Sequence, residues 1–179
     1  VGLGKSKESV EALKGILKNI KSPSVFDADA LNILSENKDF LENIPHNSIF
    51  TPHPKEFERL AGRSENSYER LEKVMDFAVK NQVFVVLKGA NTTIACPEGT
   101  CWFNSTGNPG MATAGAGDVL TGILTALLAQ GYKSQEAALL GVFLHGYAGD
   151  SAARKLSQAS MLSSDIVDGI TYFFKDFSK

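Results

Sequence analysis

The most constraining feature of the sequence is a regular alternation of short apolar runs with longer amphipathic segments. Residues 83–87 (VFVVL) form the clearest run, because five consecutive apolar residues are typical of a strand buried on both faces of a parallel sheet. Lys88 and Gly89 follow this run and end it. Shorter extended segments are predicted on either side of it, at residues 24–26, 48–51, 92–96 and 100–103.

Between these strands, apolar residues recur at the three- and four-residue spacing of helices that bury one face. Ser6 is a candidate N-cap, Pro54 fits a first helical turn, and Tyr68 is assigned to a buried helix face. Alternating strands and helices predict an α/β fold with a mostly parallel sheet, and one domain is expected over residues 1–179. The predicted helices cover residues 6–19, 29–36, 54–60, 67–80, 118–130, 134–155 and 163–176.

The composition excludes several classes of protein. Of the 179 residues, 43% are hydrophobic and 21% are charged, which is the balance of a globular chain. A net charge of −2 gives no electrostatic footprint for nucleic acid, and no run approaches the roughly 18 apolar residues of a membrane span. Two cysteines, Cys96 and Cys101, exclude a disulfide scaffold and are expected to be free thiols. The chain starts at Val1 without a signal peptide, so we expect upstream sequence to be missing and the protein to be cytoplasmic.

The segment with the most chemical content is the Gly-rich stretch 104–118 (NSTGNPGMATAGAGD). Small residues at Gly115, Ala116 and Gly117 allow backbone N–H groups to point at one spot, where a helix is predicted to begin. Unpaired amides and the helix dipole favour an anion at such a spot. Asp118 beside this anion hole has the chemistry of a general base for a substrate hydroxyl during phosphoryl transfer. The alternative is a tight turn in which Asp118 is merely a helix cap.

These residues resemble a known family. The stretch 104–131 is similar to the signature of the ADP- or ATP-dependent NAD(P)H-hydrate dehydratases, which belong to the ribokinase-like superfamily. The resemblance runs across essentially the whole chain and implies a ribokinase-like fold. One departure is Ala114 with Ala116, in AGAGD, where many members have GGSGD. Further blocks agree in order and spacing: GLG at 2–4, FDADALN at 26–32, TPHPKEFERLAG at 51–62, VVLKGANTTIA at 85–95, LHGYAGD at 144–150 and SSDIVD at 163–168.

The resemblance implies an enzyme that returns hydrated NADH or NADPH (NADHX or NADPHX) to the intact cofactor. The nucleotide phosphorylates the added hydroxyl, and phosphate leaves as the ring double bond re-forms. ADP is favoured over ATP as the co-substrate, and Mg²⁺ is expected on its phosphates instead of on a cluster of protein ligands. Asp118 is then the catalytic base, and it contacts the hydrate together with Gly4 and His53. The implied nucleotide-binding residues are Lys88, Gly89, Ala90, Asn91, Thr92 and Gly117.

Other implications concern completeness and partners. Family members have further βα units before the turn at residues 2–4, so we expect part of the substrate pocket to be missing here. A homo-oligomer is expected, with Phe173, Phe174 and Phe177 as core or subunit contacts. Two other functions remain open: a small-molecule kinase of the sugar or hydroxymethylpyrimidine type, and a non-catalytic nucleotide-binding module. An assay distinguishes these functions: restored cofactor indicates the dehydratase, a phosphorylated product indicates the kinase, and nucleotide binding without turnover indicates the binding module.

Three further polar residues have open assignments. Asp27 and Asp29 follow a short strand, where they either face phosphates through Mg²⁺ or water, or serve as a helix cap and its first-turn acid. His145 lies within an apolar helical pattern and is expected to be a packed or surface residue without a catalytic part.

Overall fold

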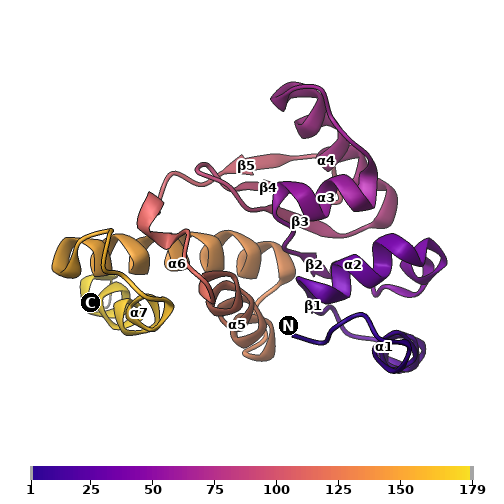
Figure 1. Cartoon of the computed structure of the whole chain (residues 1–179), viewed down its shortest axis with the longest axis horizontal. Coiled ribbons are helices and arrows are strands. Elements are labelled where there is room, and N and C mark those ends of the chain that lie inside the picture. Colours follow the sequence, from indigo (N-terminus) through magenta and orange to yellow (C-terminus); the bar gives the residue numbers. More distant parts are fainter. Residues whose placement is uncertain (1, 178–179) are drawn as a thin grey trace. The chain divides into compact units, whose positions relative to one another are not determined.

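The chain forms two compact units in a computed structural model that describes residues 2–177. Unit 1 contains the residues up to Gly89 together with Thr93–Trp102. Unit 2 contains Ala90–Thr92 and the residues from Phe103 onward. Figure 1 labels the α-helices and strands of both units.

Unit 1 is built on a five-stranded sheet whose order follows the sequence. The first two pairings are parallel, with Val25 opposite Ile49 and Ile49 opposite Phe84. The next pairing is antiparallel, with Val85 opposite Ala95, so the mostly parallel sheet predicted from the sequence has a hairpin at one edge. The strands are β1 (Val25–Phe26), β2 (Ile49–Phe50), β3 (Phe84–Leu87), β4 (Thr93–Ala95) and β5 (Cys101–Phe103).

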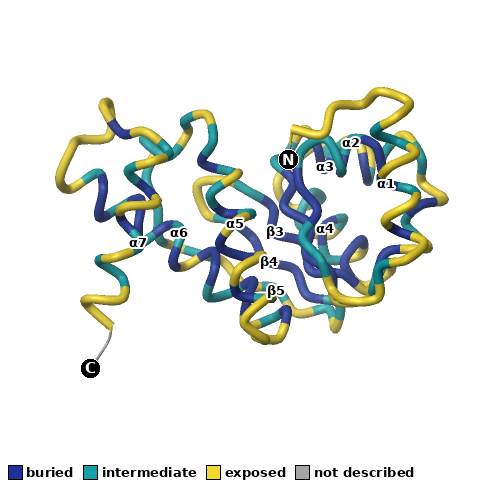
Figure 2. The backbone as a smooth tube through the Cα atoms, turned by 90° about the horizontal axis from the view of Figure 1, so that it is seen from below, coloured by how far each residue is buried: buried dark blue, intermediate teal, exposed yellow. Residues whose placement is uncertain are grey.

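Helices supply the rest of the core of unit 1. Apolar side chains from the sheet pack with those of α1, α2, α3 and α4, and Leu31, Phe50 and Phe57 are completely buried. In Figure 2, β3 and β4 carry the buried colour, because all of their residues lie inside. The helical elements are α1 (Lys7–Asn19), α2 (Asp29–Glu36), the 3₁₀ helix η1 (Lys38–Asn43), α3 (Pro54–Ala61) and α4 (Ser67–Asn81).

Unit 2 is helical, and its longest helix, α6, packs against α5, α7 and the 3₁₀ helix η2. A small core of Ala116, Ala148 and Ile166 lies between these helices. An aromatic cluster of α6 and α7 includes Phe143, with its ring 6.1 Å from that of Phe173. The elements are η2 (Pro109–Met111), α5 (Ala116–Ala129), α6 (Ser134–Leu156) and α7 (Ser163–Phe177).

Most of the predicted elements are confirmed to within one or two residues, and three details are corrected. Tyr68 is 71% exposed, because it lies in the first turn of α4 before the helix reaches the core. The helix predicted from residue 118 begins at Ala116 and follows a 3₁₀ turn inside the Gly-rich stretch. Residues 38–43 form a 3₁₀ helix that periodicity did not reveal. Within residues 2–177, no helix is long and apolar enough to cross a membrane.

Candidate functional site

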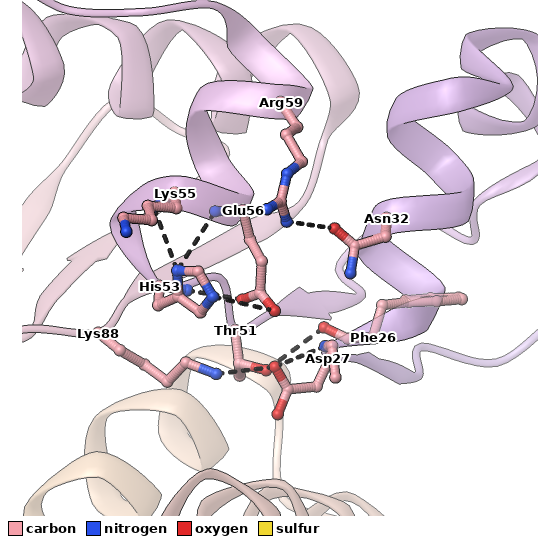
Figure 3. Close-up of polar contacts among 10 residues, drawn as sticks. Phe26, Asp27, Asn32, Thr51, His53, Lys55, Glu56, Arg59 and Lys88 are labelled. Carbon is pink, nitrogen blue, oxygen red and sulfur yellow. Dashed lines mark hydrogen bonds and ion pairs between the residues drawn. The ribbon is translucent and has the colours of Figure 1, made fainter. Parts of the chain in front are cut away.

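The parallel strands of unit 1 bring three polar residues to the same edge of the sheet. Asp27 follows β1, His53 comes three residues after β2, and Lys88 follows β3. The backbone N–H of Lys88 donates to the carbonyl of Pro52 at 2.9 Å, which continues the pairing of β2 and β3 beyond their ends. Carboxyl ends of parallel strands are the usual ligand-binding edge of an α/β sheet. Figure 3 shows the side chains gathered there.

A partly buried ion pair joins the ends of β1 and β3. The Nζ of Lys88 lies 2.8 Å from Oδ1 of Asp27, and the two side chains are 24% and 2% exposed. The same oxygen accepts the N–H of Ala28 at 2.8 Å. Asp27 is therefore held as the counter-charge of Lys88, and it is not the N-cap of α2, because that position belongs to Ala28. Lys88 is not a freely solvated strand end.

Ala28 separates the two aspartates in an unusual backbone conformation. Its φ of 52° with ψ of −119° is disfavoured for a residue with a Cβ, and such strain costs of order 1–3 kcal/mol. The turn directs Asp29 to Gly4, whose N–H donates to Oδ2 of Asp29 at 2.9 Å. Gly4 itself has a φ of +70°, a conformation that favours glycine. Asp29 is thus the first-turn acid of α2 and also holds the Gly-rich turn at residues 2–4.

His53 is the N-cap of α3. Its Nδ1 accepts the N–H groups of Lys55 and Glu56 at 3.1 and 3.3 Å, and Oε2 of Glu56 accepts the N–H of His53 at 2.9 Å. This arrangement is a capping box with an imidazole in place of the usual hydroxyl. Because Nδ1 accepts, the neutral ring must carry its proton on Nε2, which lies 3.5 Å from Oε1 of buried Glu56. Near this box, Arg59 of α3 donates to Asn32 of α2 at 2.7 Å.

The Gly-rich stretch of unit 2 ends in the first turn of α5. Gly115 is the N-cap with a φ of +85°, and a Cβ there would come within 2.8 Å of Oγ of Ser163. The first helical bond runs from Val119 to Gly115, and Ala116 donates to Thr113 at 3.3 Å. Asp118 is exposed in this first turn, and the N-cap residue has no side chain that caps the helix. One of the three amides expected to bind an anion, that of Ala116, therefore already has a partner.

The structure gives contacts to two residues of α6: His145, which was expected to be packed or at the surface, and Asp150, which the sequence did not single out. Nε2 of His145 is 2.9 Å from the carbonyl oxygen of Ala116, and because that oxygen accepts, Nε2 carries the proton. Asp150 accepts the N–H of Gly107 and the side-chain N–H of Asn108, both at 2.9 Å. His145 was expected to be a packed or surface residue, and the structure adds that its ring contacts the backbone of the predicted anion hole. Sequence reasoning had one available signal, the two glycines of LHGYAGD that allow close approach to this helix.

The predicted site residues divide between the units. The Gly-rich turn at residues 2–4 and the residues at the sheet edge that are predicted to bind the hydrate or the nucleotide lie in unit 1, whereas the predicted base and anion hole lie in unit 2. The predicted nucleotide segment starts in unit 1 and ends in unit 2, so the chain passes between units within it. Unit 1 holds Gly4, His53, Lys88 and Gly89; unit 2 holds Ala90, Asn91, Thr92, Gly115, Ala116, Gly117 and Asp118. The roles assigned to these residues stay predictions.

Neither cysteine shows the features of a reactive thiol. Cys96 and Cys101 are free, as expected, and burial raises the pKa of both thiols above the ordinary cysteine value. A hydrogen bond to Asp176 raises the pKa of the Tyr147 phenol. Within residues 2–177, no three His, Cys, Asp or Glu side chains are grouped as ligands for a metal ion.

The arrangement of the strands and helices is that of the ribokinase-like class. A ribokinase-like superfamily protein from Enterococcus faecalis has a TM-score of 0.80 and 29% identity, with 98% of this chain and 61% of that chain covered. Residues 1–172 match the family model of NAD(P)H-hydrate dehydratase. The chain therefore belongs to the NAD(P)H-hydrate dehydratase family, and the match crosses both units.

Individual relatives are consistent with this family. The bifunctional NAD(P)H-hydrate repair enzyme of Moorella thermoacetica is 43% identical over 180 aligned residues, which cover 99% of this chain and 34% of that protein. The ADP/ATP-dependent NAD(P)H-hydrate dehydratase of Bacillus subtilis, co-crystallised with ATP and Mg²⁺, has a TM-score of 0.82 and 31% identity, with 97% of this chain and 63% of that chain covered. The chain thus spans about a third of the length of the first relative and less than two thirds of the second.

Proposed function

We propose that the protein is a nucleotide-dependent dehydratase that returns NADHX or NADPHX to NADH or NADPH. The observation that carries this proposal is the exposed carboxylate of Asp118 in the first turn of α5, directly after the glycine N-cap at Gly115. A carboxylate beside helix N-terminal amides supplies a proton acceptor and a phosphate-binding group in one place. Membership of the hydrate dehydratase family supports this substrate class.

The proposed reaction has two steps. Asp118 takes the proton of the added hydroxyl group, and the hydroxyl oxygen forms a bond to the terminal phosphorus of the nucleotide. The bond between that phosphorus and the departing nucleotide breaks, so ADP gives AMP. The C–O bond then breaks, the adjacent ring carbon loses a proton, and phosphate leaves as the double bond re-forms. Phosphorylation thereby turns a poor leaving group into a good one, while backbone N–H groups at Gly115 and Gly117 stabilise the charge on phosphate.

The nucleotide is proposed to lie against residues 88–92 and Gly117, with ADP favoured over ATP. The charged Lys88, fixed by Asp27, presents an ammonium group at the carboxyl edge of the sheet. Mg²⁺ is proposed as a companion of the nucleotide phosphates, because phosphate oxygens and water are ligands that it prefers. When bound, the ion neutralises charge that develops on the transferring phosphoryl group.

The test is an assay of the complete gene product with hydrated NADH, Mg²⁺ and either ADP or ATP. Recovery of the absorbance of the reduced nicotinamide should require the nucleotide, and the faster nucleotide identifies the co-substrate. A phosphorylated product without recovered cofactor would replace the dehydratase by a small-molecule kinase. Nucleotide binding with no turnover of any kind would favour a binding module.

The variant Asp118→Asn tests the proposed base. It should lower kcat by about 10²–10⁴-fold, the usual contribution of a general base, while nucleotide binding is retained. Asp118 is exposed and no side-chain bond of the helix cap depends on it, so the fold should be unaffected. A variant with the normal rate would mean that Asp118 is not the base, and the proposed mechanism would fail.

A further inference from the structure

Helix α6 contacts the Gly-rich stretch 104–118 of unit 2 near both ends of that stretch. At the start of the stretch, Oδ2 of Asp150 accepts the N–H of Gly107 and Oδ1 accepts the side-chain N–H of Asn108. Close by, Oγ1 of Thr106 donates to the carbonyl of Phe143 at 3.2 Å. At the other end, His145 donates to the carbonyl of Ala116 in the first turn of α5.

The surface of α6 is shaped for this contact. A Cβ at Gly146 would come within 2.7 Å of the carbonyl carbon of Thr106, and a Cβ at Gly149 would come within 2.7 Å of Cγ of Met111. The clash at Gly146 is with backbone, so the stretch would have to move if a side chain were present. Gly146 therefore allows the main chain at Thr106 to lie directly on α6, and Gly149 makes room for the side chain of Met111.

We infer that His145 and Asp150 are positioning residues that set the geometry of the anion-binding turn and hence of Asp118. This inference rests on the proposed function, in which the turn binds the transferring phosphoryl group. The middle of the stretch is exposed at Ala112 and Ala114 and packs on the small core of unit 2 through Met111, whereas its polar contacts with α6 lie near its ends. His145 acts on the turn through the carbonyl of Ala116, one residue before Gly117 and two before Asp118.

Both anchors suit a fixed geometry. The carboxylate of Asp150 uses both of its oxygens, so it restrains the backbone at Gly107 and the side chain of Asn108 together. The imidazole of His145 is a rigid ring with a donor at a set distance from α6. A misplacement of about 1 Å in a catalytic group can cost about 100-fold in rate, so loss of either anchor is expected to act mainly on kcat.

The decisive comparison uses two substitutions at His145. His145→Leu removes the donor at similar volume, and should lower kcat by about 10- to 100-fold with smaller changes in both KM values. His145→Gln places an amide N–H near the position of Nε2 and should recover most of the rate. His46→Leu, which alters an exposed histidine of unit 1, is the matched control and should leave kcat unchanged.

A second readout does not depend on turnover. Amide hydrogen exchange in the first turn of α5 should be faster in His145→Leu than in the wild type and normal in His145→Gln, because the anchor restrains that turn. Asp150→Ala should speed exchange at residues 106–111 in the same way. An active wild type with an unchanged kcat in His145→Leu would refute this inference alone. A wild type that does not restore NADH would instead overturn the proposed function.

Discussion

His53 has one role in the structure and a second, proposed role, and a pair of substitutions separates them. In the structure it caps α3, with Nδ1 accepting from Lys55 and Glu56. The family resemblance implies that it also contacts the hydrated cofactor, and we propose that contact here. His53→Ala removes both, whereas His53→Asn keeps an acceptor of the right length for the cap but has no imidazole Nε2. Asparagine is among the best N-cap residues, so the second variant is a matched control for the first.

The stability effects follow from the cap. Losing the side chain of a capping residue costs about 1–2 kcal/mol, and for a chain of this size 1 kcal/mol lowers Tm by about 2–4 °C. His53→Ala should therefore melt about 2–8 °C below the wild type by circular dichroism or calorimetry. His53→Asn should melt close to the wild type. The buried carboxylate of Glu56 keeps its bond to the backbone N–H of residue 53 in both variants.

The effects of the two His53 variants on KM should not parallel their effects on Tm. A single hydrogen bond contributes about 0.5–1.5 kcal/mol, so loss of the imidazole should raise KM for the hydrate by about 2- to 12-fold in both variants. KM for the nucleotide should change much less. Normal hydrate kinetics in His53→Asn, with a defect confined to His53→Ala, would show that His53 is a cap alone and would refute its assignment to the substrate site. An equal effect on both KM values would also remove it from that site.

Two further predictions concern the turn at the end of β1. Lys88→Met removes the positive charge that faces the buried carboxylate of Asp27. It should therefore lower the free energy of unfolding, measured by urea titration, by about 3 kcal/mol. The double variant Asp27→Asn/Lys88→Met should recover part of that loss, because the buried negative charge is removed as well. If the double variant were no more stable than Lys88→Met, the loss of stability would not come from the unpaired charge of Asp27. Ala28→Gly should raise the free energy of unfolding by about 1 kcal/mol, because glycine relieves the positive φ. The control is Ala12→Gly, at an exposed position inside α1, which should lower the free energy of unfolding by about 1 kcal/mol. If Ala28→Gly also lowered the free energy of unfolding, the backbone at Ala28 would not be strained.

Much of the local structure could be predicted from the sequence, because it depends on neighbours along the chain. The apolar run at residues 83–87 became β3, buried at every position, and Ser6 caps α1 as expected. Pro54 stands at the first turn of α3. The Gly-rich stretch leads into a helix with Asp118 in its first turn, although that helix begins two residues earlier than periodicity indicated. Periodicity, caps and glycine act over a few residues, so a sequence displays them directly.

The sequence by itself therefore determined the order of strands and helices, the family, and the chemical character of Asp118, Lys88 and His53. Only the tertiary structure decided which groups these residues meet. Asp27 and Lys88 are 61 positions apart and pair because β1 and β3 lie on either side of β2 in a parallel sheet. His145 reaches Ala116 across 29 positions because α6 packs on α5. Such contacts depend on how whole elements pack, and the sequence carries only a partial signal of that packing, such as the two glycines of LHGYAGD.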